Sequence, residues 1–112
     1  MVVRGCVLFP RSLMPLFIFE PRYRKMLSEA LETDRMFCLA GPKPGSPRGS
    51  PCEVAGLGLV RASVLNGDGT SNLVLQGLTR VRLGKAVRYK PYRQHLIEPL
   101  EDDVEESLVV DA

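Results

Sequence analysis

The chain has 112 residues, enough for one domain built around a single hydrophobic core. Hydrophobic residues make up 45% of it and charged residues 25%, a composition that excludes a fully disordered chain and is typical of a globular protein. No apolar run approaches the roughly 20 residues of a membrane-spanning helix. The apolar start of the chain is broken by Pro10 and Arg11 before it reaches the length of a signal peptide. We therefore expect a cytoplasmic protein with no membrane partner.

The formal net charge of +2 at pH 7 hides an uneven distribution along the chain. Residues 1–100 hold all 15 Lys and Arg against 7 acids, a net charge of +8, whereas residues 101–112 hold 6 acids and no base. A basic body can attract nucleic acid or acidic partners, and an acidic tail can shield it, although two solvated surfaces account for the same pattern. We therefore divide the chain into a domain over residues 1–100 and an acidic tail or truncated linker over residues 101–112.

The first third of the chain predicts extended segments followed by a helix. Residues 2–9 indicate a short strand, and residues 13–19 a second extended segment that enters the core, with Pro15 at an edge or kink. A helix follows from Pro21, which suits the first helical position, and ends near residues 33–34. Its apolar stripe has helical spacing and consists of Tyr23, Met26, Leu27, Ala30 and Leu31.

The rest of the chain predicts strands and turns. The expected strands are residues 36–40, 54–65, 71–76, 80–89 and 92–98. A Pro-, Gly- and Ser-rich excursion separates the first two at residues 41–51, and residues 66–69 (NGDG) form a hairpin turn. Gly56 and Gly58 indicate close approach or a bulge, and Gly84 a shift of register after the inward-facing Val81 and Leu83. Five to seven strands with one helix favour a small closed or half-closed barrel over a doubly wound sheet.

Most catalytic machinery is missing from the sequence. His95 is the one histidine, and the three cysteines, Cys6, Cys38 and Cys52, are too widely spaced for a metal or disulfide motif. We expect reduced, partly buried thiols. No phosphate-binding loop is present, and neither Gly-x-Gly opens a helix. A Cys–His nucleophile pair stays open, because its partners need only meet in space. We predict no enzyme, no metal site and no cofactor.

One segment of the sequence indicates a family far more specifically than the overall composition does. Residues 7–23 (VLFPRSLMPLFIFEPRY) contain the core IFEPRY, followed by a helix. Later segments follow in order, VAGLGLVRASV, a hairpin with DGT, LVLQGLTRVRL and YKPYRQHLIEPLED. Together they resemble the amino-terminal domain family of the Lon proteases over residues 7 to about 102.

The resemblance implies a mainly β (α+β) fold, a PUA-like pseudo-barrel of about six strands with the helix of residues 21–32 beside the sheet. In such proteases this domain serves substrate recognition and assembly, ahead of ATPase and Ser–Lys protease modules that this sequence does not contain. The chain therefore looks like a stand-alone bacterial member of the family or a fragment of one. Family members usually have a full first strand and often continue into a helical region after the barrel, whereas here only Met1 to Cys6 precedes Val7 and the sequence stops at Ala112. Truncation at these ends stays an open alternative.

From this resemblance we predict a module that recognises exposed hydrophobic or unfolded protein segments. The candidate peptide groove consists of Phe9, Pro10, Leu13, Met14 and Leu16, because Pro-rich extended backbone leaves ladder positions open and Met adapts to varied partners. The motif residues Phe19, Glu20, Pro21, Arg22 and Tyr23 are interpreted as structural. Glu20 and Arg22 would cap the helix or pair with neighbours, and Phe17, Phe19 and Tyr23 would belong to the core.

Two other functions stay open. In residues 80–93, six basic residues interleave with two tyrosines, a pattern that suits phosphates and stacked bases of RNA. The candidate residues are Arg80, Arg82, Arg88, Tyr89, Lys90, Tyr92 and Arg93. A homo-oligomer assembled through short edge strands is the third reading.

Overall fold

The computed structural model describes residues 1–2, 8–42, 44–45, 51–100 and 108–111. Within these ranges the chain forms six strands and one helix. The elements are β1 (Leu13–Ile18), α1 (Pro21–Glu32), β2 (Met36–Leu39), β3 (Val54–Leu65), β4 (Ser71–Arg88), β5 (Gln94–Pro99) and β6 (Leu108–Asp111). The prediction of a mainly β fold with one helix near the amino terminus is confirmed.

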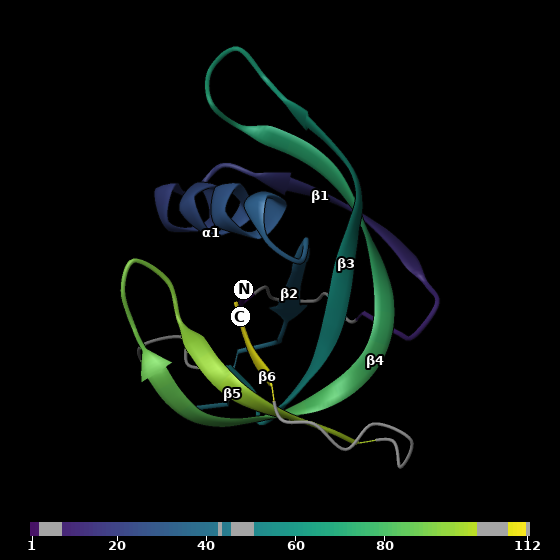
Figure 1. Cartoon of the computed structure of the whole chain (residues 1–112), viewed down its shortest axis with the longest axis vertical. Coiled ribbons are helices and arrows are strands. Elements are labelled where there is room, and N and C mark those ends of the chain that lie inside the picture. Colours follow the sequence, from purple (N-terminus) through teal and green to yellow (C-terminus); the bar gives the residue numbers. More distant parts are fainter. Residues whose placement is uncertain (3–7, 43, 46–50, 101–107, 112) are drawn as a thin grey trace.

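The strands form one curled sheet in the order β1-β4-β3-β2-β6-β5 (Figure 1). The 18-residue strand β4 pairs with β1 and β3 along its first part and with β5 along its second, so the sheet bends back on itself. All these pairings are antiparallel except that of β2 with β6, which consists of one registered pair, Phe37 and Asp111. The curled sheet is therefore no regular closed barrel, and the half-closed alternative of the sequence prediction is the one observed.

Local signals set both ends of α1. Pro21 is at its start, and the extended residue Glu20 offers its carbonyl oxygen to the N–H groups of Tyr23 and Arg24 at 3.0 and 2.9 Å. At the other end Arg35 has a φ of 62° and donates its N–H to the Ala30 carbonyl at 2.8 Å, which turns the chain into β2. No helix in the described ranges is both long and apolar enough to cross a membrane.

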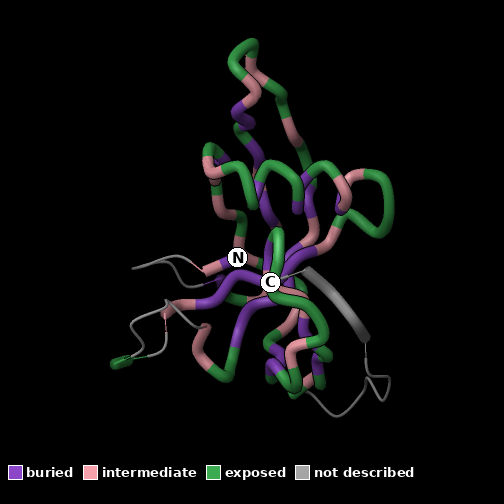
Figure 2. Tube along the Cα trace, turned by 90° about the vertical axis from the view of Figure 1, so that its left-hand side faces the viewer, coloured by how far each residue is buried: buried purple, intermediate pink, exposed green. Residues whose placement is uncertain are grey.

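The helix packs its apolar face on the concave side of the sheet, beside β1 (Figure 1). The predicted stripe is confirmed: four of its five members are buried, and Leu31 is half-buried against the same cluster. This first core cluster comprises Met1, Leu8, Ile18, Tyr23, Met26, Leu27, Phe37, Leu39, Val60, Leu73, Leu75 and Tyr92. Figure 2 shows these buried stretches inside the body, with the exposed tip of the β3–β4 hairpin projecting beyond it.

Strand β2 separates two core clusters. Alternate residues of a strand point to opposite faces, so Phe37 belongs to the first cluster and Cys38 to a second, and both have no exposed surface. The continuous apolar run of residues 36–40 follows from burial on both faces. The second cluster comprises Cys38, Ala40, Ala55, Leu57, Val81, Leu83 and Ile97.

The structure corrects the prediction of separate strands at residues 71–76 and 80–89. These residues form the single strand β4, which continues through the buried Gly77. The Gly77 N–H donates to the Ser12 carbonyl at 2.9 Å, and its carbonyl accepts the Arg11 N–H at 2.7 Å. A glycine that looks like a strand break in sequence is here a point of close backbone approach, which keeps the hydrogen-bond ladder intact.

The remaining predicted strands, turns and segment limits agree with the structure only in part. Strand β3 and the hairpin turn match their predicted positions, and register shifts occur next to Gly58 and around Gly84. Of the strand expected at residues 2–9, Val2 forms an isolated bridge with Ala40, residues 8 and 9 are not in a strand, and residues 3–7 lie outside the described ranges. Most of the excursion at 41–51 also lies outside them. Residues 108–111, assigned by sequence to the tail, form β6; the domain boundary at residue 100 stays a prediction.

Candidate functional site

The first candidate site is an apolar surface on the outer side of β1 and its neighbours. In β1, Leu13 and Phe17 are 64% and 50% exposed, and Pro15 between them is exposed as well. Cross-strand partners share a face of a sheet. The registers of β1, β4 and β3 therefore continue this surface from Pro15 to Val74 and from Phe17 to Val64. We define the outer apolar face as Leu13, Pro15, Phe17, Ala62, Val64 and Val74.

A shallow groove of about 420 Å³ crosses this face. Its walls come from three strands: Pro15, Leu16 and Phe17 of β1, Ala62, Ser63 and Val64 of β3, and Asn72, Leu73 and Val74 of β4. Phe19 lies next to it and stacks on Phe17, with 5.9 Å between ring centroids. Apolar rings that stay in water at a groove are typical of a surface that meets a partner.

The core assignment of Phe17 and Phe19 is therefore wrong. Both rings are half exposed or more, whereas Ile18 between them is 1% exposed. Because side chains alternate between the two faces of a strand, Ile18 points into the core while Phe17 and Phe19 point to the solvent. Tyr23, on the helix, is 4% exposed and belongs to the core as predicted.

The five predicted groove residues do not share one surface. Phe9 and Leu13 are exposed and Pro10 is half-buried. Met14 and Leu16 have the opposite parity in β1 and pack against the first core cluster, although the half-buried Leu16 also lines the groove. Period-two alternation in β1 was the sequence signal that could have separated them.

The motif residues at the start of α1 contact one another and the start of the chain. The Glu20 carboxylate pairs with the Arg22 guanidinium at 2.9 Å, on the surface. The Arg22 guanidinium lies over the Tyr23 ring, 4.5 Å from its centroid. The Tyr23 hydroxyl accepts the Val2 N–H at 3.1 Å, so the motif also ties the start of the chain to the helix.

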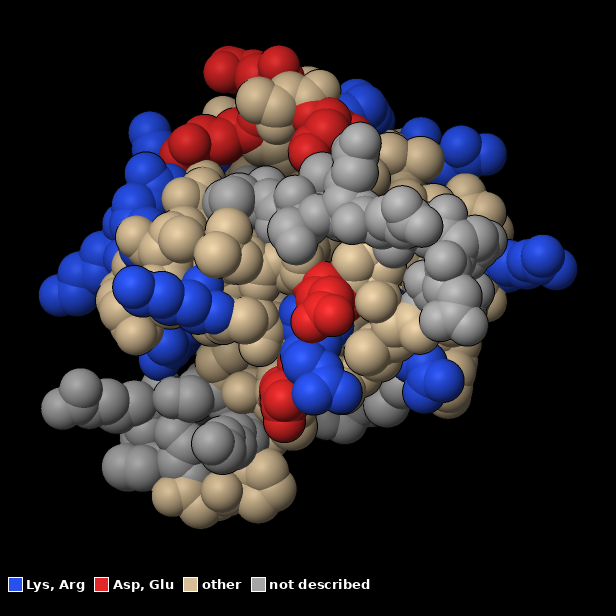
Figure 3. Space-filling model, turned by 60° about the horizontal axis from the view of Figure 1, so that its bottom comes forward, with Lys and Arg blue, Asp and Glu red and all other residues tan. Residues whose placement is uncertain are grey.

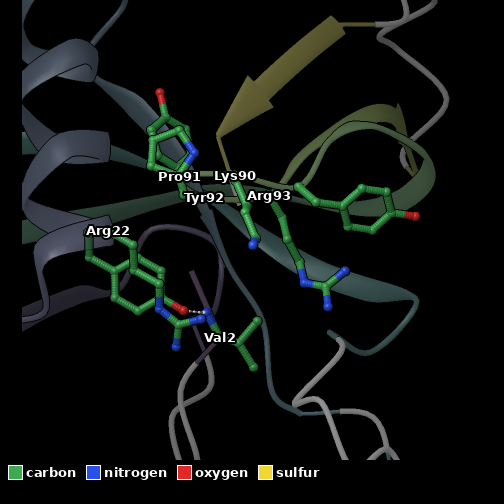
Figure 4. Close-up of a pocket in the computed structure, with 8 residues that line it drawn as sticks. Val2, Arg22, Lys90, Pro91, Tyr92 and Arg93 are labelled. Atoms are coloured by element: carbon green, nitrogen blue, oxygen red, sulfur yellow. Dashed lines mark hydrogen bonds between the residues drawn. The ribbon is translucent and has the colours of Figure 1, made fainter.

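The second candidate site is a hollow of about 390 Å³ between the start of α1 and the β4–β5 connection (Figure 4). Three of its lining residues are cations. We define this cationic pocket by its lining: Val2, Arg22, Tyr23, Tyr89, Lys90, Pro91, Tyr92 and Arg93. Four of these residues belong to the RNA surface predicted from the sequence, whereas no local sequence pattern connects Val2 and Arg22, near the other end of the chain, with them.

The proposed RNA residues do not form one stripe. Arg80 and Arg82 are exposed on β4, and Arg82 pairs with Glu53 at 3.2 Å. Tyr92 is 2% exposed, so its ring cannot stack on a base. Tyr89, Lys90 and Arg93 line the cationic pocket, where the Arg93 guanidinium lies over the Tyr89 ring. Arg88 does not line it, and its guanidinium lies over the Tyr92 ring. In the face that Figure 3 shows, Lys and Arg side chains occupy separate positions with acidic ones between some of them. Nucleic-acid binding and oligomer formation stay predictions.

The histidine and the two described cysteines are wholly or partly buried. His95 is 7% exposed, and its Nδ1 lies 3.0 Å from the Gly84 carbonyl oxygen. Because a carbonyl oxygen only accepts, Nδ1 is the donor of this hydrogen bond. Cys38 is buried and Cys52 half-buried, and Cys6 lies outside the described ranges. In those ranges no three His, Cys, Asp or Glu side chains cluster as metal ligands.

Two solved structures share this fold. The Lon N-terminal domain protein from Xanthomonas campestris superimposes with a TM-score of 0.74 at 21% sequence identity, over 95% of this chain and 60% of that one. The N-terminal domain of the Mycobacterium avium complex Lon protease gives a TM-score of 0.70 at 10% identity, over 95% of this chain and 55% of that one. At these identities the likeness shows the fold alone.

Sequence relatives agree with this fold. The Lon protease of Trichlorobacter lovleyi is 29% identical over 110 residues, which are 90% of this chain and 13% of that protein. The Lon protease of Syntrophus aciditrophicus is 30% identical over 105 residues, 88% of this chain and 13% of that protein. The chain thus spans a small part of these relatives. The model of the ATP-dependent protease La (LON) substrate-binding domain matches residues 1–111, and the chain belongs to this family.

Proposed function

We propose that this substrate-binding domain is a non-catalytic module that binds exposed hydrophobic segments of unfolded proteins on its outer apolar face. The observation that carries the proposal is the cluster of exposed apolar side chains on β1, β4 and β3, with a groove across it. The family assignment supports a binding role, because the matched domain is defined by substrate binding.

An open strand edge lies beside this face. β1 is at the end of the strand order, and β4 is its one strand partner among the described residues. An unpaired edge can accept an extended segment as an added strand through backbone hydrogen bonds, which depend little on sequence. Alternate side chains of such a segment would then lie along the outer apolar face.

The expected affinity is modest. Covering about 400 Å² of apolar surface contributes roughly 10 kcal/mol at about 25 cal/mol per Å². Lost motion and ordering oppose this by about 4–15 kcal/mol. We therefore expect dissociation constants in the micromolar range or weaker, which suits a receptor that samples many segments.

The test is a fluorescence titration with a permanently unfolded, carboxymethylated model protein. We expect Val64→Ser and Phe17→Ser to weaken binding at least about fivefold, because each removes an apolar group from the face. Val87→Ser is the matched control, since Val87 is 50% exposed on the far end of β4 and outside the face. The absence of binding at high micromolar protein, or an equal loss in the control, would overturn the proposal.

A further inference from the structure

We propose that the cationic pocket binds the free α-carboxylate at the end of a polypeptide, with the apolar side chain of its last residue against the pocket wall. The inference rests on the proposed function to the extent that the ligand is a protein segment. It adds a second site, which selects chain ends and lies apart from the outer apolar face.

The charge of the pocket points to an anion. Arg22, Lys90 and Arg93 line it, and none of its lining residues in the described ranges is acidic. Arg22 engages Glu20 through Nε, which leaves both of its Nη groups for a ligand. Lys90 and Arg93 form no ion pair with any residue that the structure describes. Three positive charges around one hollow raise its affinity for an oxyanion, and guanidinium forks match the two oxygens of a carboxylate.

The donors are held in position. The Arg22 guanidinium is stacked 4.5 Å from the Tyr23 centroid, and the Arg93 guanidinium 5.2 Å from that of Tyr89. The Tyr23 hydroxyl accepts the Val2 N–H, so its own proton is left to donate to a ligand. In Figure 4 the Lys90 amine and the Arg93 guanidinium extend from the β4–β5 connection towards the side where Arg22 and Val2 lie.

The walls favour a carboxylate that carries an apolar group over a bare anion. Val2, Pro91 and the ring of Tyr89, which is 63% exposed, stand beside the cations. At about 390 Å³ the hollow is within the range of about 300–1,000 Å³ typical of organic ligand pockets. The last residue of a polypeptide combines the two features, since its side chain branches from the carbon that bears the carboxylate.

The experiment compares two peptides of one unstructured sequence that ends in Leu, one with a free carboxylate and one with a carboxamide. With the full chain we expect the free acid to bind about tenfold tighter, equivalent to about 1.4 kcal/mol. Lys90→Met should remove most of this preference. Lys85→Met, at an exposed lysine of β4 outside the pocket, should retain it.

A second readout does not depend on the variants. The side-chain Nε–H resonance of Arg93 should shift in NMR spectra on addition of the free acid, and stay in place with the amide. Equal affinity for both peptides overturns the inference, as does a preference that persists in Lys90→Met. If the protein binds the acid and the amide peptide equally and inorganic phosphate displaces both, the pocket is a phosphate site, and this result also overturns the inference.

These outcomes are separable from failure of the proposed function. If both peptides bind equally well and Val64→Ser weakens both, the pocket inference is overturned and the proposed function stands. If neither peptide binds, the pocket inference and the proposed function are both overturned.

Discussion

At the scale of single residues, two glycines set how closely the chain can pack on itself. A Cβ at Gly58 would lie 2.5 Å from Cγ of the buried Leu75, so a side chain there would displace a core residue. A Cβ at Gly77 would overlap the carbonyl oxygen of Phe9. The backbone at Gly77 is also held by two hydrogen bonds to the segment before β1, and it cannot move away without losing them.

We therefore expect Gly77→Ala to lower the free energy of unfolding by about 1–3 kcal/mol, the usual range for overpacking. Gly67→Ala is the control, because a Cβ at Gly67 meets no atom within 4 Å and should change stability by less than about 0.5 kcal/mol. Urea unfolding of both variants measures the difference. Equal stability of the two would contradict the close approach at Gly77.

Residue identity alone predicted part of the candidate site. Leu13, a predicted groove residue, lies on the outer apolar face, whereas the predicted groove residues Met14 and Leu16 pack against the core and only Leu16 also reaches the groove. Phe17 was assigned to the core and is exposed. All four are apolar residues in one extended run, so composition could not distinguish them, and the parity of the strand relative to the sheet decided their side.

At the scale of elements, the β3–β4 hairpin is closed by a polar turn. The Asn66 N–H donates to the Thr70 carbonyl at 2.7 Å, and Gly69 has a φ of +88°, which a glycine adopts without strain. The Asp68 carboxylate accepts the Thr70 hydroxyl at 2.6 Å and the Thr70 N–H at 3.0 Å. These bonds, the hydroxyl first, hold the pKa of Asp68 below its ordinary value of 3.8.

An NMR titration of the Asp68 carboxyl should therefore give a midpoint below 3.8. Thr70→Val removes the hydroxyl donor and should move the pKa of Asp68 back towards 3.8, whereas Thr79→Val, outside the turn, should leave it unchanged. Because the pKa is lower in the folded state, the stabilisation of the turn is fully present above the unfolded-state pKa. It is lost as the pH falls through the folded-state pKa. A midpoint unaffected by Thr70→Val would show that the hydroxyl is not the cause.

At the scale of the whole molecule, β6 joins strands that are distant in sequence. Four of its residues are in register with β5, from the pair Gln94–Asp111 to the pair Ile97–Leu108, and Asp111 is also opposite Phe37 of β2. Residues 108–110 are a weakly apolar end to an acidic segment, with no turn signal that would place them. Both partner strands, β2 and β5, precede β6 in the chain. The free edges of these two strands therefore decide where β6 pairs.

A chain of residues 1–100 should accordingly be less stable than the full chain by at least about 2 kcal/mol, because several ladder hydrogen bonds are lost at about 0.5–1.5 kcal/mol each. Its exposed edges at β2 and β5 should also promote association at high concentration. Urea unfolding and light scattering measure the two effects, with removal of residue 112 alone as the control. Full stability of residues 1–100 would instead support the predicted domain boundary.

The sequence by itself determined the local elements: the helix from Pro21, the limits of β3 and the NGDG turn follow from periodicity and backbone preference, which act over a few residues. The tertiary structure alone decided which side of β1 meets water, that β4 runs through Gly77, and that Arg22 shares a pocket with Lys90 and Arg93. These features depend on contacts between segments far apart in the chain. Such contacts are selected by packing over the whole sheet, and no local preference encodes them.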